Sequence, residues 1–375
     1  MEDPKETAVP QRLHSWLRSR LAQDRPLARF VRRRLVRPLM LRWRLRFPHL
    51  VQIETVTACN ARCIMCPTPT MERKKGFIAE ALYRKIIDEC ARYRHTLRSL
   101  GLYLSGEPLL DKQLPERVRY AHDRRLRDVY FSTNAQLMTA EKSARLIEAG
   151  LDRLYVSLDG TTKETYEKVR VGLNFDTVVR NVDTFLRLRR ERQSRVKVEM
   201  QIIRLDETVH EVEPFVARWK DQADRVVVKD GHNWAEQSDN RPHSRLTHPT
   251  ARKPCPQLWY NLNVFDNGDV PLCCYDYEGK AILGNVERQS LRQVWRGERL
   301  QRIRAAHLRL DFSEMPLCDA CINTWHIGDE PVWWFEPGEI RAVPKTAGAA
   351  PPAIGVLLPP PKPAADPAGA AGPRP

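Results

Sequence analysis

The feature that most constrains this chain is a regular alternation of apolar or β-branched runs with helical patterns through its middle. The apolar runs are predicted strands, at residues 51–57, 101–104, 128–132, 154–158, 196–203 and 226–229. Helical patterns separate them, at residues 79–93, 112–124, 140–149, 163–170, 175–192 and 209–221. Six strand–helix units in succession predict an α/β fold, a parallel sheet with helices outside and its chemistry at the carboxyl ends of the strands. The pattern leaves open whether the sheet stays flat or curls into a partial barrel.

Both ends of the chain depart from this alternation. Residues 1–50 hold 13 Lys and Arg against 4 Asp and Glu, which is +9 of the chain's net +15. Residues 1–48 therefore predict a basic, amphipathic helical extension. It either packs on its own domain or uses residues 12–47 to bind an anionic membrane surface, a nucleic acid or an acidic partner. Residues 344–375 are almost all Pro, Ala and Gly and predict a disordered tail.

The sequence shows no apolar run long enough to span a membrane and no signal-peptide pattern, so we expect a cytoplasmic protein, peripheral at the membrane if the N-terminus binds there. Nine cysteines in such a compartment favour metal-binding or catalytic thiols over disulfides. Cys90, alone in a predicted helix, is interpreted as a core residue.

The pattern changes after residue 250. Residues 259–275 predict a β-hairpin that turns at Asp266–Asp269, and residues 291–306 predict a helix. We therefore expect a main domain over residues 49–240 and a small, separate α+β module over residues 250–335.

Three close cysteines follow the first predicted strand, in the sequence TACNARCIMCP. Cys59, Cys63 and Cys66 could bind zinc with a fourth ligand from elsewhere, although structural zinc sites usually present two CxxC pairs. Three thiolates suit a [4Fe-4S] cluster better, because they hold three irons and leave the fourth open to a chelating molecule.

This CxxxCxxC motif, placed after the first of six strand–helix units, resembles the radical S-adenosylmethionine (SAM) superfamily. The resemblance implies a partial (β/α)6 barrel of the TIM type and a [4Fe-4S] cluster whose open iron binds SAM. It also implies reductive cleavage of SAM to methionine and a 5′-deoxyadenosyl radical, which abstracts a substrate hydrogen. In the family an aromatic residue that packs on adenine precedes the last cysteine, and Met65 occupies that place here.

Further motifs of the family follow in the expected order at the tips of later strands. LSGEP resembles the family's GGEP, with Ser105 in place of the first glycine, Gly106 for close backbone approach and Glu107 to accept from the SAM ammonium group. FSTNA resembles STNG, which makes Ser132 and Asn134 polar contacts for SAM.

The fourth strand carries the next motif. VSLDG resembles SxDG and makes Ser157 and Asp159 candidates to bind the ribose hydroxyls. Arg170 resembles the arginine that pairs with the SAM carboxylate.

A second cysteine group resembles the SPASM domain that follows radical SAM cores, in the shortened form of a Twitch-type domain. Cys255, Cys273, Cys318 and Cys321 would hold one auxiliary [4Fe-4S] cluster, with structural zinc as the alternative. Cys274 is either spare or exchanges with Cys273.

The resemblance implies a radical SAM enzyme, and we expect it to oxidise or otherwise modify a small polar metabolite of the sugar or cyclitol kind. A peptide maturase is one alternative, and an iron–sulfur protein that binds nucleic acid or membrane through its basic N-terminus is another. We expect an electron donor of the flavodoxin or ferredoxin type, and we do not expect the protein to bind DNA. Five residues are candidate substrate contacts unless they lie in an ordinary linker: His232, Asn233, Trp234, Tyr275 and Asp276. The sequence nominates no general base.

Overall fold

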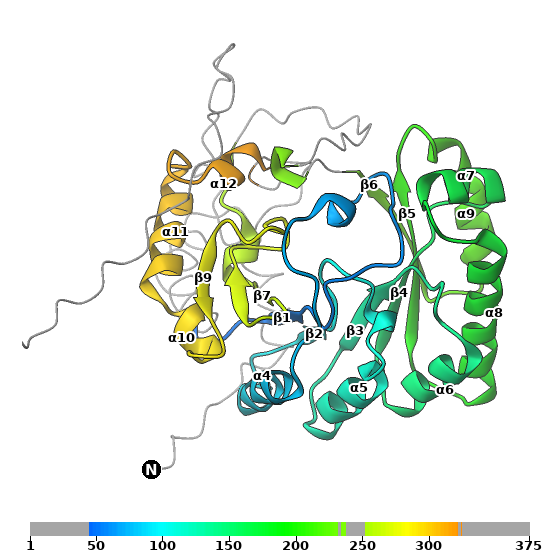
Figure 1. The fold of residues 1–375 in the computed structure, drawn as a ribbon, viewed down its shortest axis with the longest axis horizontal. Coiled ribbons are helices and arrows are strands. Elements are labelled where there is room, and N and C mark those ends of the chain that lie inside the picture. The colour runs from blue at the N-terminus through cyan, green and yellow to red at the C-terminus, as the bar shows by residue number, and fades with distance from the viewer. Residues whose placement is uncertain (1–44, 232–233, 238–251, 322–323, 325–375) are drawn as a thin grey trace, which may run out of the picture.

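The structure is a computed structural model that describes residues 45–231, 234–237, 252–321 and 324 (Figure 1). Nearly all of the predicted N-terminal extension and the whole predicted tail lie outside the described residues, as do His232 and Asn233. No described helix is long and apolar enough to cross a membrane.

The core of the described chain is a seven-stranded sheet with the order β6-β5-β4-β3-β2-β1-β7. Every neighbouring pair in it is parallel. The strands are β1 (Leu50–Ile53), β2 (Ser99–Gly101), β3 (Val129–Thr133), β4 (Arg153–Ser157), β5 (Lys197–Arg204), β6 (Arg225–Asp230) and β7 (Asn261–Val264). The parallel α/β sheet predicted from the sequence is confirmed, and it is not closed, because β6 and β7 are its two edges.

Helices follow the strands in turn and surround the sheet on its outer side (Figure 1). They are α4 (Glu80–Arg92), α5 (Leu114–Asp123), α6 (Ala140–Glu148), α7 (Lys163–Val169), α8 (Phe175–Glu191) and α9 (Val212–Trp219). Thr139, Thr162 and Asn174 start α6, α7 and α8, because each side chain accepts a hydrogen bond from the third backbone N–H of its helix. The helix predicted over residues 209–221 is interrupted, since Val209–Glu211 forms a separate turn of 3-10 helix.

The two faces of the sheet differ in chemistry. In β1 and β5, Val51, Ile53, Val198, Met200 and Ile202 are fully buried and apolar, as expected for a face that packs on helices. At alternate positions near the middle of the same strands lie Gln52, Glu199 and Gln201, which are polar and also buried. Since successive side chains point to opposite faces, the sheet turns an apolar face to its helices and a polar face inwards.

The predicted hairpin at Asp266–Asp269 is only partly correct. The chain does turn there, with the Phe265 N–H donating to the Asp269 carbonyl at 2.8 Å. However, β7 pairs in parallel with β1, whereas β8 (Asp269–Pro271) pairs antiparallel with β9 (Ile282–Asn285) in a second sheet. The turn therefore joins two sheets, and the expectation of a separate module is wrong for β7. The exposed edge of β1 explains the difference, because it offers β7 a full hydrogen-bonding ladder.

The helical pattern at residues 291–306 is also divided. It forms α10 (Leu291–Trp295) and α11 (Glu298–Arg309), which are separated by Gly297 in an extended conformation. Glu89 of α4 accepts hydrogen bonds from the first two N–H groups of α10, at 2.8 and 3.0 Å. This carboxylate fixes α10 to the main domain. A last short helix, α12 (Pro316–Ala320), carries Cys318.

Candidate functional site

The three cysteines of the first motif lie in the loop that follows β1, at the carboxyl end of the sheet. The backbone N–H groups of Arg62 and Ile64 donate to the carbonyls of Val171 and Val169, at 2.8 and 3.1 Å. These bonds attach the loop to the end of α7, so its shape is fixed by a segment more than a hundred residues away.

Gly106 packs directly against the start of the cysteine loop. A Cβ atom at this position would lie 2.1 Å from the Val56 carbonyl oxygen and 2.6 Å from that of Ala58. The N–H of Glu107 donates to the same Ala58 carbonyl at 2.9 Å. The close approach expected at Gly106 is therefore an approach to the backbone that precedes Cys59.

Glu107 is buried among hydrogen-bond donors. Its carboxylate accepts from the Thr133 hydroxyl at 2.6 Å, from the Asn134 N–H at 2.8 Å and from the Leu109 N–H at 3.0 Å. Burial raises the pKa of Glu107, and these donors oppose the rise. The carboxylate is thus held in one orientation at the tips of β2 and β3.

The polar residues of the third and fourth strands lie together at the same edge. The Asn134 side chain donates to Asn60 of the cysteine loop at 2.8 Å, and the hydroxyls of Ser132 and Ser157 are 3.3 Å apart. Ala135, which stands where the family has glycine, has a φ of 59°. The turn thus keeps the left-handed conformation despite the added methyl group.

Asp159 and Arg170 form a buried ion pair beside the cysteines. Arg170 donates to Asp159 through Nη2 and lies 3.5 Å from the Cys63 sulfur through Nη1. The other oxygen of Asp159 accepts from the Ile203 N–H at 2.6 Å. Both oxygens of Asp159 therefore have protein partners in this structure. Burial raises the pKa of the Cys63 thiol, and the positive charge of Arg170 opposes that rise.

The loop after β6 connects the first cysteine loop to the second cysteine group. Trp234 donates from Nε1 to the carbonyl of Met65 at 2.9 Å, and its ring contacts the ring of Tyr275 edge-on at 5.6 Å. Gln237 donates to the Tyr275 carbonyl at 2.6 Å. Trp234 and Tyr275, two of the candidate substrate contacts, thus lie against each other between the two cysteine groups.

Asp276, another candidate substrate contact, has a different position. It is fully buried, and its carboxylate accepts from the N–H groups of Lys280 and Ala281 at 2.8 and 2.9 Å. It closes the turn that precedes β9, and we no longer interpret it as a substrate contact.

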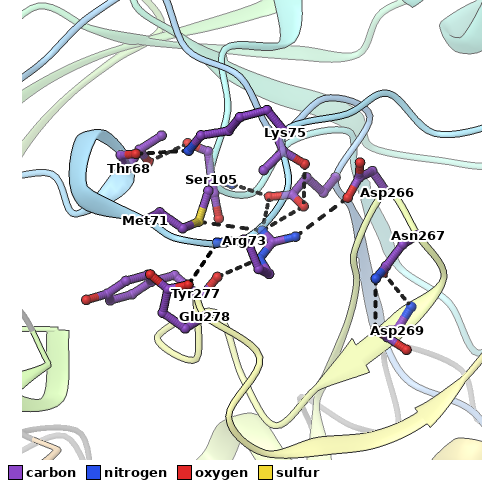
Figure 2. Close-up of polar contacts among 12 residues, drawn as sticks. Thr68, Met71, Arg73, Lys75, Ser105, Asp266, Asn267, Asp269, Tyr277 and Glu278 are labelled. Atoms are coloured by element: carbon purple, nitrogen blue, oxygen red, sulfur yellow. Dashed lines mark hydrogen bonds and ion pairs between the residues drawn. The ribbon is translucent and has the colours of Figure 1, made fainter.

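Sequence reasoning missed a group of polar contacts around Arg73 (Figure 2). Its guanidinium lies 2.9 Å from both oxygens of Glu54, the residue that follows β1, and donates from Nε to the Tyr277 carbonyl at 2.7 Å. The backbone N–H of Arg73 donates to Glu278 at 3.2 Å. Arg73 thereby joins the end of β1 to the segment that follows Cys273 and Cys274. A polar residue directly after an apolar strand was the available signal for Glu54.

The second cysteine group lines one small cavity. Its wall contains Cys255, Cys273, Cys274, Cys318 and Cys321, together with His307 and Thr324. The residues come from four separate segments, and within the last of them the Thr324 hydroxyl donates to the carbonyls of Cys318 and Cys321. The structure thus brings together all four cysteines of the predicted set.

The adjacent residues Cys273 and Cys274 differ in the electrostatic environment of their thiols. Burial raises the pKa of Cys273, and the thiols of Cys274, Cys321, Cys318 and Cys255 raise it further. Burial also raises the pKa of Cys274, to about 11, but among the thiols only Cys255 contributes. Electrostatic interaction with the other thiols therefore affects the pKa of Cys273 more than that of Cys274. Cys90 is fully buried in the core, as expected.

The donor chemistry of both groups fits iron–sulfur clusters. Three cysteines share one loop, and the others share one cavity, so thiolate sulfur is the ligand that each offers. Within the described ranges, no three His, Cys, Asp or Glu side chains are close enough to hold a single metal ion. The fit therefore rests on which segments converge and on their burial.

Two family models match this chain. The model of the Radical SAM superfamily matches residues 53–216, and that of SPASM, an iron-sulfur cluster-binding domain, matches residues 255–322. The first match contains Cys59, Cys63 and Cys66, and the second contains all five cysteines of the cavity.

Curated relatives match over shorter stretches. A probable GTP 3′,8-cyclase of Methanococcus maripaludis (strain C5) is 32% identical over 130 residues, which are 33% of this chain and 41% of that protein. Mycofactocin maturase MftC of Mycobacterium tuberculosis is 31% identical over 143 residues, 38% of this chain and 33% of that protein. The matches thus span less than half of the length of these relatives.

Among solved structures, Streptococcus suis SuiB bound to its precursor peptide SuiA superposes with a TM-score of 0.58. The two chains are 14% identical, and the match covers 72% of this chain and 70% of that one. At this identity the likeness describes the fold.

Proposed function

This chain belongs to the radical SAM superfamily and carries a SPASM iron–sulfur domain, and from that premise we propose that it oxidises a small, polar, hydroxylated metabolite. Its cofactors are SAM, a [4Fe-4S] cluster that binds SAM, and an auxiliary iron–sulfur cluster. When bound, these groups supply a 5′-deoxyadenosyl radical for hydrogen abstraction and a second redox centre. The SPASM match favours iron–sulfur over the zinc alternative in the second group.

We assign the ligands from the cysteine positions. Cys59, Cys63 and Cys66 would hold the cluster that binds SAM, and Arg170 would lie beside Cys63. Cys255, Cys273, Cys318 and Cys321 would hold the auxiliary cluster. Glu107, Asn134, Ser132 and Ser157 lie at the tips of neighbouring strands, where SAM would bind.

The polar inner face of the sheet carries the substrate proposal. On β5 and β6 the Lys229 ammonium donates to Gln201 at 2.8 Å, and on β7 and β1 Asn261 donates to Gln52 at 2.9 Å. Amide and ammonium groups of this kind can also hydrogen-bond the hydroxyls of a ligand, whereas an apolar substrate offers them no such partner.

A four-thiolate auxiliary site suits an oxidation. Loss of a hydrogen atom, then of a proton and an electron, removes two electrons from the substrate, and the second electron needs an acceptor. The link from Met65 through Trp234 and Gln237 to Tyr275 supports this role, because it holds the two cysteine groups against a common loop.

Peptide maturation is the second candidate. The likeness to MftC over 143 residues and to the fold of SuiB favours it, because MftC is a maturase and SuiB was solved with a precursor peptide. Binding of membrane or nucleic acid by residues 12–47, and an electron donor of the flavodoxin or ferredoxin type, remain expectations from the sequence.

The experiment measures where the abstracted hydrogen comes from. Anaerobically reconstituted protein receives dithionite, SAM and a uniformly deuterated cell extract divided into small-molecule and peptide fractions. Deuterium in 5′-deoxyadenosine from the small-molecule fraction is the expected result. Deuterium from the peptide fraction alone would replace the proposal with peptide maturation.

A further inference from the structure

His307 is buried beside the second cysteine group but is not one of its proposed ligands. It lies on α11, is fully buried and lines the cavity of the second cysteine group. Its ring meets the ring of Phe312 edge-on at 4.9 Å, which fixes the plane of the imidazole.

The proton of the His307 ring can be assigned from its hydrogen bond. The backbone N–H of Cys255 donates to Nδ1 of His307 at 3.1 Å. A ring nitrogen that accepts a hydrogen bond carries no proton, so in the neutral ring the proton is on Nε2.

The Nε2–H group has no hydrogen-bond partner among the described residues, although it is shielded from solvent. Buried N–H groups are nearly always paired, because an unpaired one loses its hydration without compensation. Gln257 also lines the cavity, and its Oε1 atom likewise lacks a partner there, so the two groups do not satisfy each other. The cavity wall is otherwise made mainly of thiols and apolar side chains.

We propose that His307 is a hydrogen-bond donor to the auxiliary cluster, with Nε2–H directed at a cluster or cysteine sulfur and Nδ1 holding the backbone of Cys255. The inference rests on the proposed cysteine ligands of that cluster and is independent of the substrate. His307 is thus a positioning residue with two functions, one for each ring nitrogen.

The donor should make the cluster easier to reduce. A hydrogen bond to sulfur withdraws electron density from the cluster and stabilises the reduced form, whose charge is more negative. Its removal therefore shifts the midpoint potential to a more negative value.

Two substitutions separate the ring nitrogens. His307→Asn keeps an acceptor near the position of Nδ1, for Cys255, but removes the donor into the cavity. His307→Gln places an amide N–H near the position of Nε2 and loses the acceptor. Both are made in the full chain with both clusters, and the auxiliary cluster is identified as the one whose EPR signal does not change when SAM is added.

Redox titration followed by EPR gives the result. For His307→Asn we expect the ratio of reduced to oxidised auxiliary cluster at a fixed potential to fall about tenfold, a shift of about 59 mV for one electron. His307→Gln should titrate like the wild type. A wild-type potential in His307→Asn, or the same shift in both variants, would overturn the proposal.

A measurement on the wild type keeps the test independent of how the variants fold. With histidine labelled by ¹⁵N, pulsed EPR of the reduced auxiliary cluster should show one weakly coupled histidine nitrogen. Absence of that coupling would refute the hydrogen bond, and a strong coupling would make His307 an iron ligand instead.

Discussion

The guanidinium of Arg73 lies 2.9 Å from both carboxylate oxygens of Glu54, whose side chain is fully shielded from solvent. Arg73 follows the first cysteine motif, whereas its other partners, Tyr277 and Glu278, follow Cys273 and Cys274 of the second cysteine group. The guanidinium also stacks on Phe265, with its central carbon 3.6 Å from the centre of the ring. One arginine thus holds together the ends of both cysteine-bearing segments (Figure 2).

Removal of this arginine should destabilise the protein strongly. Arg73→Met leaves the Glu54 carboxylate buried without its charge partner, which costs about 3–5 kcal/mol for a pair of this kind. Anaerobic urea unfolding followed by circular dichroism measures the loss. The matched control is Arg84→Met, because Arg84 and Glu80 form an exposed pair at 2.6 Å, which contributes little to stability. Equal losses in both variants would contradict the importance of burial.

The same pair predicts a pH dependence. Burial raises the pKa of Glu54 above its ordinary value of 4.5, and Arg73 opposes the rise. A carboxyl with a raised pKa binds its proton more tightly in the folded state, so its contribution to stability is lost as pH rises through that pKa. Without Arg73 the rise is larger. The loss of stability caused by Arg73→Met should therefore become smaller as pH falls towards 4.5. When Arg73→Met is added to the Glu54→Gln variant, the loss that it causes should depend much less on pH.

Iron content should distinguish ligand cysteines from the core cysteine. Wild type should hold about eight irons in two [4Fe-4S] clusters, and Cys59→Ala, Cys63→Ala, Cys66→Ala should hold about four and cleave no SAM. Cys90→Ala is the control. It removes a buried thiol from the core and should lower stability while iron content and SAM cleavage stay unchanged. Full iron content in the triple variant would refute the first ligand set.

The adjacent cysteines of the second group should differ in the same assay. Four other thiols of the group contribute to the raised pKa of Cys273, so we expect Cys273→Ala to lose the auxiliary cluster and retain about four irons. Cys274→Ala should retain both clusters. The reverse result would exchange the roles of these two residues.

Loss of the auxiliary cluster should uncouple SAM cleavage from oxidation of the substrate. Cys318→Ala, Cys321→Ala should form 5′-deoxyadenosine but almost no oxidised product once the substrate is known. Because loss of a cluster can unfold its surroundings, circular dichroism and SAM affinity must first match those of wild type. Normal product yield would make the auxiliary cluster structural.

Gly106 offers a test of the packing behind the first motif. In Gly106→Ala the added methyl group overlaps the carbonyls of Val56 and Ala58, which belong to the backbone and cannot rotate away. We expect a loss of about 1–3 kcal/mol and weaker SAM binding by equilibrium dialysis. At Gly172 a Cβ would meet only the Asn60 carbonyl at 3.6 Å, so Gly172→Ala controls for backbone strain alone. Equal SAM affinity in both variants would argue against the packing account.

The sequence predicted the strands and helices of the main domain to within a few residues, because each has a strong local pattern and a turn on either side. It failed at β7, since the pattern NLNV is the same whether its partner is the next strand or β1. It also failed at Gly297, where one extended glycine divides a helical pattern.

The site was predictable where a motif carries it and not where single residues do. The spacing of the cysteines in the sequence identifies them as candidate ligands, and the resemblance to the family identifies the polar residues at the strand tips. No such signal marks Arg73, Glu54 or His307, because each is an ordinary residue whose role depends on partners distant in the sequence. Asp276 was misinterpreted for the related reason that a turn carboxylate and a ligand-binding carboxylate look alike in one sequence.

The pairing of β7 with β1 sets an order of events during synthesis. Leu50 pairs with Asn261, so β1 leaves the ribosome roughly 210 residues before its outer partner. At about 5–20 residues per second this delay is on the order of 10–40 s. Throughout it, one edge of β1 has no strand to pair with, next to the loop that bears Cys59, Cys63 and Cys66, and an unpaired strand edge invites association with other chains. During synthesis the nascent chain is therefore open to such association beside its first cysteine motif, and arrival of β7 ends that interval.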